Sequence, residues 1–193
     1  MDESKEFQIN QPAVAKETTP KKSAVLSFFR ELPFLILGAF LIAFLIKTFV
    51  VQPFKIEQQS MYPTLYPADR VFVNKFIYRF REPARGEIIT FRAPDGKRIL
   101  IKRIIATEGE TVQIKKGRVF IDKKPIKENY LKTSPDYTDF KATKIPKNAV
   151  FVMGDNRPNS GDSRLFGAVS EENLLGEAFL VYWPVEHLKI VRE

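Results

Sequence analysis

A run of apolar residues from Leu32 to Val51 constrains this chain more than any other feature of its sequence. About 20 such residues, wound as a helix, span the hydrocarbon core of a bilayer. The apolar character extends around the whole helix, which disfavours a helix that buries one stripe in a soluble core. A cleaved secretory signal is also disfavoured, because the run starts far from Met1 and no small-residue cleavage site follows it. The pattern therefore predicts a retained transmembrane helix over residues 32–51.

The segments on either side of this run predict how the chain is oriented. Residues 1–31 are mainly polar and cannot bury a core, which predicts a disordered tail. Lys and Arg residues gather before the apolar run, and this asymmetry favours a cytoplasmic N-terminus. Residues 52–193 would then form a domain on the outer face of the plasma membrane, anchored by a single pass.

After Gln52 the hydrophobic pattern changes to the period of β-strands. Asp95-Gly96 and Lys116-Gly117 are turn signals between strand-like runs. The polar segment 128–147 is predicted to be a long excursion, and no strong amphipathic helix is evident. The domain is therefore expected to be mainly β, with strands rich in β-branched and aromatic residues near 70–74, 87–91, 98–106, 111–114, 149–153 and 178–182.

The composition excludes several chemistries. The chain has no Cys, so it has no disulfide framework, no thiolate metal site and no cysteine nucleophile. The single histidine, His187, excludes a multi-histidine metal site and lies near the C-terminus, which is a poor context for a catalytic triad. The net charge of +8 is scattered over turns and strand edges rather than along a helix. We therefore expect no metal, no cofactor and no nucleic-acid partner, with weak attraction to anionic lipid as a second interpretation of the charge.

Ser60 stands directly between the apolar run and the β-rich region. Pro63 fixes its own φ and restricts Tyr62, so the serine sits on a stiff turn and is a candidate nucleophile. Taken alone, a linker serine is the more frequent explanation of such a motif. Ser60 lies nine positions beyond Val51, a link that reaches about 30 Å at most when fully extended. The serine is therefore expected close to the membrane surface.

Lys102 is a candidate general base. On a strand it shares one face with Leu100 and Ile104, and such apolar neighbours lower the pKa of a lysine. A neutral lysine can activate a serine hydroxyl. A lysine that keeps a sheet edge soluble is the structural alternative.

A third segment, residues 154–164, is dense in small polar residues directly after a predicted strand. These residue types also dominate ordinary turns. Its two carboxylates and two arginines nevertheless favour a rigid, ion-paired loop, and long ordered polar loops often carry function.

Together the three segments resemble the conserved boxes of the type I signal peptidases, which are membrane-anchored Ser-Lys endopeptidases. The resemblance lies in residues 60–64, in Lys102-Arg103 and in residues 154–164. It implies a β-rich catalytic domain that removes signal peptides from exported precursor proteins at the lipid bilayer. It also implies cleavage after small residues, as in Ala-x-Ala, without a cofactor.

The resemblance further implies a role for individual residues. Ser60 would be the nucleophile, Lys102 the general base, and Ser160 the hydrogen-bond partner of Lys102. The Ser60 N–H would form part of the oxyanion hole. Relatives carry a serine or glycine where this chain has Gln58, so the amide of Gln58 is the expected second donor.

Two ion pairs and a set of pocket residues complete the expected site. Asp155 would pair with Arg103, and Asp162 with Arg164. The shallow pockets for small substrate side chains would be lined by apolar residues, namely Phe54, Ile56, Met61, Leu65, Leu100 and Ile101.

Two other functions remain open at this point. A self-cleaving Ser-Lys protein would need a DNA-binding segment, and none is visible in the sequence. A membrane-tethered binding domain would use Ser60 and Lys102 only structurally. Processing of a separate precursor would distinguish the peptidase from both.

Overall fold

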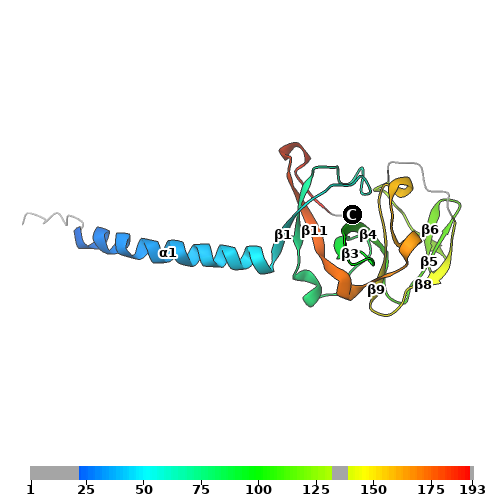
Figure 1. Ribbon diagram of the computed structural model, residues 1–193, viewed down its shortest axis with the longest axis horizontal. Helices are drawn as coiled ribbons and strands as arrows, with labels where there is room; N and C mark the ends of the chain where they lie inside the picture. The colour runs from blue at the N-terminus through cyan, green and yellow to red at the C-terminus, as the bar shows by residue number, and fades with distance from the viewer. Residues whose placement is uncertain (1–21, 132–138, 192–193) are drawn as a thin grey trace, which may run out of the picture. The chain divides into compact units, whose positions relative to one another are not determined.

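The computed structural model describes residues 22–131 and 139–191 (Figure 1). The chain divides into two compact units, Met1–Ala43 and Phe44–Glu193. Most of the tail predicted over residues 1–31 lies outside the described residues, and the part from Lys22 onward is helical. In the described part of the chain, no helix reaches the combination of length and hydropathy that a bilayer crossing requires.

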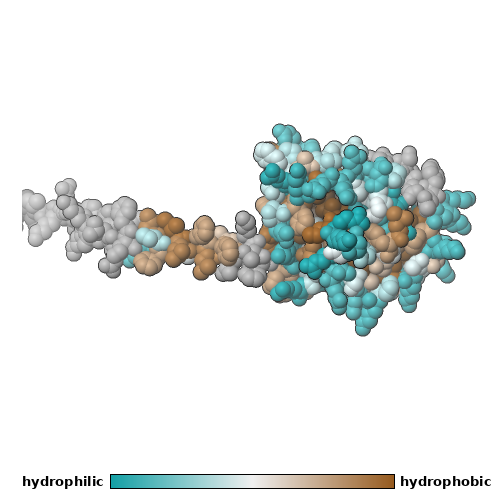
Figure 2. All heavy atoms as spheres, viewed as in Figure 1, coloured by the Kyte–Doolittle hydropathy of each residue, from teal (hydrophilic) through white to brown (hydrophobic). Residues whose placement is uncertain are grey.

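Helix α1 (Lys22–Phe49) contains most of the predicted apolar segment. It ends at Phe49 rather than at Val51, because Val51 already pairs with Asn74 of the neighbouring strand. Figure 2 shows hydrophobic residues along the described part of the helix. Its exposed large side chains are Phe34, Leu35, Ile36, Leu37, Phe40, Leu41, Ile42 and Phe44.

The main sheet is antiparallel and holds eight strands. Strand β12 (Lys189–Ile190) pairs with β11 outside the linear order. The other strands follow the order β1 (Val51–Lys55), β2 (Arg70–Asn74), β11 (Leu174–Trp183), β3 (Ile88–Arg92), β4 (Ile99–Ala106), β9 (Ala149–Met153) and β10 (Val169–Ser170).

A smaller sheet forms the opposite end of the domain from β1 and β11 (Figure 1). Its order is β7 (Lys124–Pro125), β6 (Arg118–Ile121), β5 (Thr111–Lys115) and β8 (Phe140–Lys144). Short helical turns connect the strands, namely η1 (Ile77–Arg79), η2 (Arg157–Asn159), α2 (Ser163–Phe166), η3 (Glu171–Asn173) and η4 (Val185–His187).

The mainly β prediction is confirmed, and six strands of the described residues were not predicted, namely β1, β6, β7, β8, β10 and β12. Two of them show why. Strand β1 contains Pro53, which reads as a helix stop in the sequence. It is compatible with a strand here because β1 lies at the edge of the sheet. Strand β8 falls within the predicted excursion 128–147, and its residues are mostly exposed, so they show little hydrophobic alternation.

Strand β4 is the element that positions the site. Leu100 and Ile104 pack in one apolar cluster, Ile105 belongs to a second, and Ile101 packs against a third. The side chains of β4 therefore alternate between separate parts of the core, as the strand period predicts. Apolar side chains on both faces of β4 pack in the core, so Lys102 and Arg103, which lie between them in the strand, are held in place.

A close approach by Gly176 allows β11 to lie between β2 and β3. Its φ is +153°, and a Cβ at this position would come within 2.3 Å of the Asn74 carbonyl oxygen. The pairing of β11 with both neighbours is irregular, with bulges on each side. Glycine is therefore required here for steric and conformational reasons.

Candidate active site

Ser60 lies in a tight turn whose neighbours are anchored in the core. The Tyr62 N–H donates to the Gln59 carbonyl at 3.0 Å, which closes the turn around the serine. Met61 and Leu65 are fully buried in the cluster beneath it. These two residues therefore anchor the turn in the core, and their place in the substrate pockets stays a prediction.

Lys102 meets Ser60 in the interior. Its Nζ donates to Ser60 Oγ at 2.6 Å and to the Ile101 carbonyl at 2.9 Å. The lysine is 1% exposed and the serine 4% exposed. Burial lowers the pKa of Lys102 to about 8, and the charges of Asp162 and Asp155 oppose this shift only in part. The arrangement can therefore supply a neutral amine beside a serine hydroxyl near neutral pH.

The residue after Lys102 forms a buried ion pair. Arg103 Nε and Nη2 donate to the two carboxylate oxygens of Asp155 at 2.9 and 2.8 Å. Both side chains are 1% exposed. Arg103 Nη1 donates to the Gly86 carbonyl at 2.7 Å, and the guanidinium lies 4.0 Å from the centroid of the Tyr130 ring. The predicted pairing is made, and it is bidentate, which is the strongest geometry for such a pair.

Thr64 ties the serine turn to this ion pair. Its hydroxyl donates to Asp155 Oδ2 at 2.5 Å. This contact is not predictable from the sequence, because 91 positions separate the two residues. The signal that could have found it is a hydroxyl four residues after the nucleophile, on the same stiff turn.

The second predicted ion pair organises the polar loop. Arg164 Nε and Nη2 donate to the carboxylate of Asp162 at 2.8 Å each. Asp162 also accepts from the Gly154 N–H at 3.0 Å and caps helix α2 through the Arg164 N–H. A side chain that satisfies the first N–H groups of a helix fixes where that helix begins. The loop is thus rigid, as expected from its paired charges.

Ser160 differs from its expected role. It was predicted to hydrogen-bond Lys102, but its Oγ is buried without a hydrogen-bond partner among the described residues. The hydroxyl lies instead against Gly154, where an added Cβ would come within 2.3 Å of it and within 2.4 Å of the Ser60 carbonyl oxygen. Gly154 is therefore required for the close packing of the polar loop on the serine turn.

A groove of about 460 Å³ lies beside the serine turn. It is lined by residues 52–58, by Thr90, and by Lys97 and residues 99–101. Four of the six predicted pocket residues line it, namely Phe54, Ile56, Leu100 and Ile101. Gln58 also lines the groove and is exposed, and its role as second oxyanion donor stays a prediction.

The free edge of β4 borders this groove. Strand β9 pairs with β4 only from Arg103 onward, whereas β3 pairs with β4 from Ile99 to Arg103. Residues 99–102 therefore present one edge without a strand partner in the described part of the chain. Such an edge can accept an extended peptide as an added strand.

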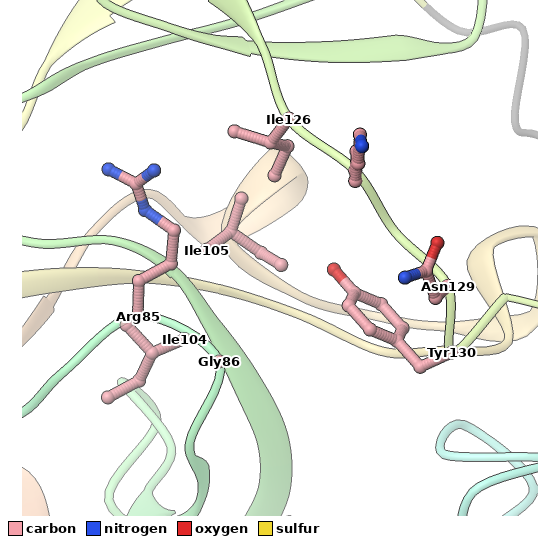
Figure 3. Close-up of a pocket in the computed structure, with 8 residues that line it drawn as sticks. Arg85, Gly86, Ile104, Ile105, Ile126, Asn129 and Tyr130 are labelled. Carbon is pink, nitrogen blue, oxygen red and sulfur yellow. The ribbon is translucent and has the colours of Figure 1, made fainter. Parts of the chain in front are cut away.

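A larger cavity of about 550 Å³ is lined by other residues than the groove (Figure 3). Its lining includes Ile104 and Ile105 of β4 and, on the opposite side, Asn129 and Tyr130. Neither Ser60 nor Lys102 lines this cavity. The smaller groove lies nearer to them in the chain, because its lining includes Gln58 and Ile101, which are two residues before Ser60 and one before Lys102.

His187 has a different partner. Its Nδ1 lies 2.6 Å from Asp69 Oδ1, and its ring is 4.7 Å from the ring of Tyr66. The hydroxyl of Ser60 pairs with Lys102 instead. The geometry thus defines a serine–lysine site rather than a serine–histidine site.

Residues 29–183 match the family described as signal peptidase, peptidase S26. The chain is 42% identical over 151 residues to a signal peptidase I from Leptolyngbya laminosa, which covers 74% of each chain. It is 37% identical over 187 residues to a probable signal peptidase I-2 from Synechocystis, covering 93% of this chain and 85% of the relative. A signal peptidase I P from Bacillus subtilis subsp. natto is 34% identical over 179 residues, covering 88% and 95%.

The fold and the site define a serine endopeptidase. The chain belongs to the signal peptidase family, peptidase S26, whose signal peptidase I members remove signal peptides from secreted precursors. The family expected from the three sequence segments is therefore confirmed.

We predict that the Arg103–Asp155 pair is essential for the stability of the domain. Arg103→Met leaves the Asp155 carboxylate buried and unpaired, which should lower the free energy of unfolding by about 3–5 kcal/mol. Urea denaturation followed by tryptophan fluorescence measures this loss. The control is Arg98→Met, which removes an exposed pair with Asp95 and should leave the urea midpoint nearly unchanged. An unchanged midpoint for Arg103→Met would contradict the assignment.

Proposed function

We propose that this protein cleaves signal peptides by a dyad of Ser60 and Lys102. The observation that carries the proposal is the buried 2.6 Å contact between Ser60 Oγ and Lys102 Nζ. Neutral Lys102 accepts the proton of the serine hydroxyl as Oγ attacks the scissile carbonyl carbon. The resulting ammonium then gives this proton to the leaving amine, and an acyl-enzyme ester remains on Ser60.

The same lysine serves in the second half of the reaction. A water molecule attacks the ester, and Lys102 accepts its proton, which returns to Ser60 Oγ as the ester bond breaks. The mature protein leaves in the first half and the signal peptide in the second. In both halves the Ser60 N–H is positioned to stabilise the oxyanion, where a preorganised donor has its largest effect.

The substrate would bind as an extended strand in the groove. The free edge of β4 at residues 99–102 supplies backbone groups, and Phe54 and Ile101 supply apolar contacts. Phe54, Ile56, Leu100 and Ile101 are the predicted pocket residues that line this groove. A shallow groove of this kind favours small side chains next to the scissile bond.

Residues 32–51 are proposed to anchor the domain in the plasma membrane. The run has the length of a bilayer span, and helix α1 carries exposed large apolar side chains where they are described. Anchoring of enzyme and precursor in one bilayer raises their effective concentration. The short link from Val51 to Ser60 keeps the nucleophile within about 30 Å of Val51.

The dyad predicts a specific dependence of activity on pH. Lys102 must be neutral, and with a pKa of about 8 only about one tenth of it is neutral at pH 7. The kcat/KM for a precursor should therefore rise about tenfold per pH unit below pH 8 and level off above it. A profile that is flat from pH 6 to 9 would contradict the role of Lys102.

Variants of the two residues test the same mechanism. Lys102→Arg should be inactive because guanidinium stays protonated, and Ser60→Ala should be equally inactive. The double variant should be no worse than either single one, because the two groups act as a unit. Circular dichroism confirms that each variant is folded. A folded Lys102→Arg protein with near-normal activity would overturn the proposal.

The groove predicts which residue precedes the cut. A precursor ending its signal peptide in Ala-x-Ala should be processed, whereas Phe in place of the last Ala should lower kcat/KM by at least about 100-fold, since a bulky ring cannot enter. Processing is followed by electrophoresis and by N-terminal sequencing of the mature product. Changes at the middle residue serve as the control and should have small effects. Equal cleavage of the Ala and Phe precursors would contradict the proposed pocket.

The anchor predicts the side of the membrane on which the domain lies. Protease added to intact spheroplasts should degrade residues 52–193 and spare a tag fused before Met1. A cytoplasmic protein in the same spheroplasts is the control for membrane integrity. Protection of the domain together with the tag would contradict this topology.

A further inference from the structure

Asn156 holds two consecutive carbonyl groups of the serine turn. Its backbone N–H donates to the Ser60 carbonyl at 3.0 Å, and its side-chain Nδ2 donates to the Gln59 carbonyl at 3.1 Å. The residue is 5% exposed, so these bonds are sheltered from water. The polar loop thus binds the main chain of the serine turn at two successive carbonyl groups, those of Gln59 and Ser60.

This grip fixes the direction of the Ser60 N–H. The Gln59–Ser60 peptide bond is trans, so the Gln59 carbonyl and the Ser60 N–H point in opposite directions within one rigid plane. The Gln59 carbonyl accepts from Asn156 and from Tyr62 N–H at 3.0 Å. The Ser60 N–H therefore faces away from Asn156, and it donates to no other residue in the described ranges.

Two hydrogen bonds hold the Gln59 carbonyl, and the one from the side-chain amide of Asn156 comes from outside the turn. The bond from Tyr62 is local and moves with the turn, whereas Asn156 belongs to a loop that is fixed by the Asp162–Arg164 pair. The other end of the amide is held loosely, since Asn159 Nδ2 lies 3.4 Å from Asn156 Oδ1. The contact with Gln59 is thus the shorter of the two side-chain bonds.

We propose that Asn156 is a positioning residue that aims the Ser60 N–H at the oxyanion of the reaction. The inference rests on the proposed Ser60–Lys102 mechanism and extends it to a residue outside the dyad. Asn156 is uncharged and acts through a backbone peptide plane. The pKa of Lys102 is set by its burial and by the charges of Asp162 and Asp155. The amide of Asn156 therefore affects the oxyanion and leaves the base unchanged.

The test compares Asn156→Ala and Asn156→Asp with the wild-type enzyme on an Ala-x-Ala precursor. The alanine variant should lose roughly 10–100-fold in kcat, because a misaimed donor weakens the transition state, while KM changes by less than about threefold. The aspartate variant should lose more, since a carboxylate cannot donate and repels the Gln59 carbonyl. If Asn156→Ala does not fold, Asn156→Ser takes its place in the test. Serine also removes the side-chain amide donor, and it leaves a smaller cavity than alanine does.

Two further readouts separate positioning from a general loss of structure. A peptide aldehyde ending in alanine forms a tetrahedral adduct with Ser60, and its affinity should fall by the same factor as kcat/KM. In Asn156→Ala, the rise of kcat/KM with pH should still level off near pH 8. Asn159→Ala is the matched control, because it removes an amide from the same loop that makes only a 3.4 Å contact, and its kcat should change by less than about threefold.

Full kcat in Asn156→Ala would overturn the inference, as would a loss confined to KM or a shifted pH limb. Unchanged aldehyde affinity alongside reduced kcat would also overturn it. Each of these outcomes leaves the proposed function standing, provided that the wild type processes the precursor and Ser60→Ala does not. Failure of the wild type to process the precursor counts against the proposed function itself.

Discussion

The burial of Lys102 against Ser60 is the contact on which the rest of this structure depends. An amine that is 1% exposed loses most of its hydration, and this loss brings its pKa down to about 8. Two carboxylates nearby oppose the shift, and each is engaged by its own arginine, Asp155 by Arg103 and Asp162 by Arg164. Burial is the larger of these effects, so the pKa of Lys102 falls. The two ion pairs also hold the polar loop together.

Strand β4 holds Lys102 and Arg103, two neighbouring residues with different partners. Successive side chains of a strand point in opposite directions, so Lys102 reaches Ser60 while Arg103 reaches Asp155. The serine turn contacts both of these sites, since Thr64 on the same turn donates to Asp155. Displacement of the ion pair would therefore move the turn that carries Ser60 as well as the strand that carries Lys102.

Periodicity predicted strands whose apolar residues pack in the core. The segments 70–74 and 149–153 coincide with β2 and β9, because their alternating or continuous apolar residues pack directly in the core. Strand β1 was missed because Pro53 indicates a helix stop, and only the position of β1 at the sheet edge makes proline acceptable in a strand. The exposed strand β8 was missed because its pairing with β5 comes from backbone bonds rather than from a hydrophobic pattern.

By itself the sequence determined the reactive groups, since a chain without Cys and with a single His187 leaves few bases for Ser60, and apolar neighbours mark Lys102 as the one most easily neutralised. It also determined the family, because three short segments occur in the right order. Only the tertiary structure decided which side chains face the site. Met61 and Leu65 are buried in the core, Asn156 binds the serine turn, and the hydroxyl of Ser160 has no hydrogen-bond partner within residues 22–131 and 139–191. The physical reason is that these contacts join residues far apart in the chain, whose distances depend on how the polar loop packs against the turn, whereas residue chemistry and strand period are local.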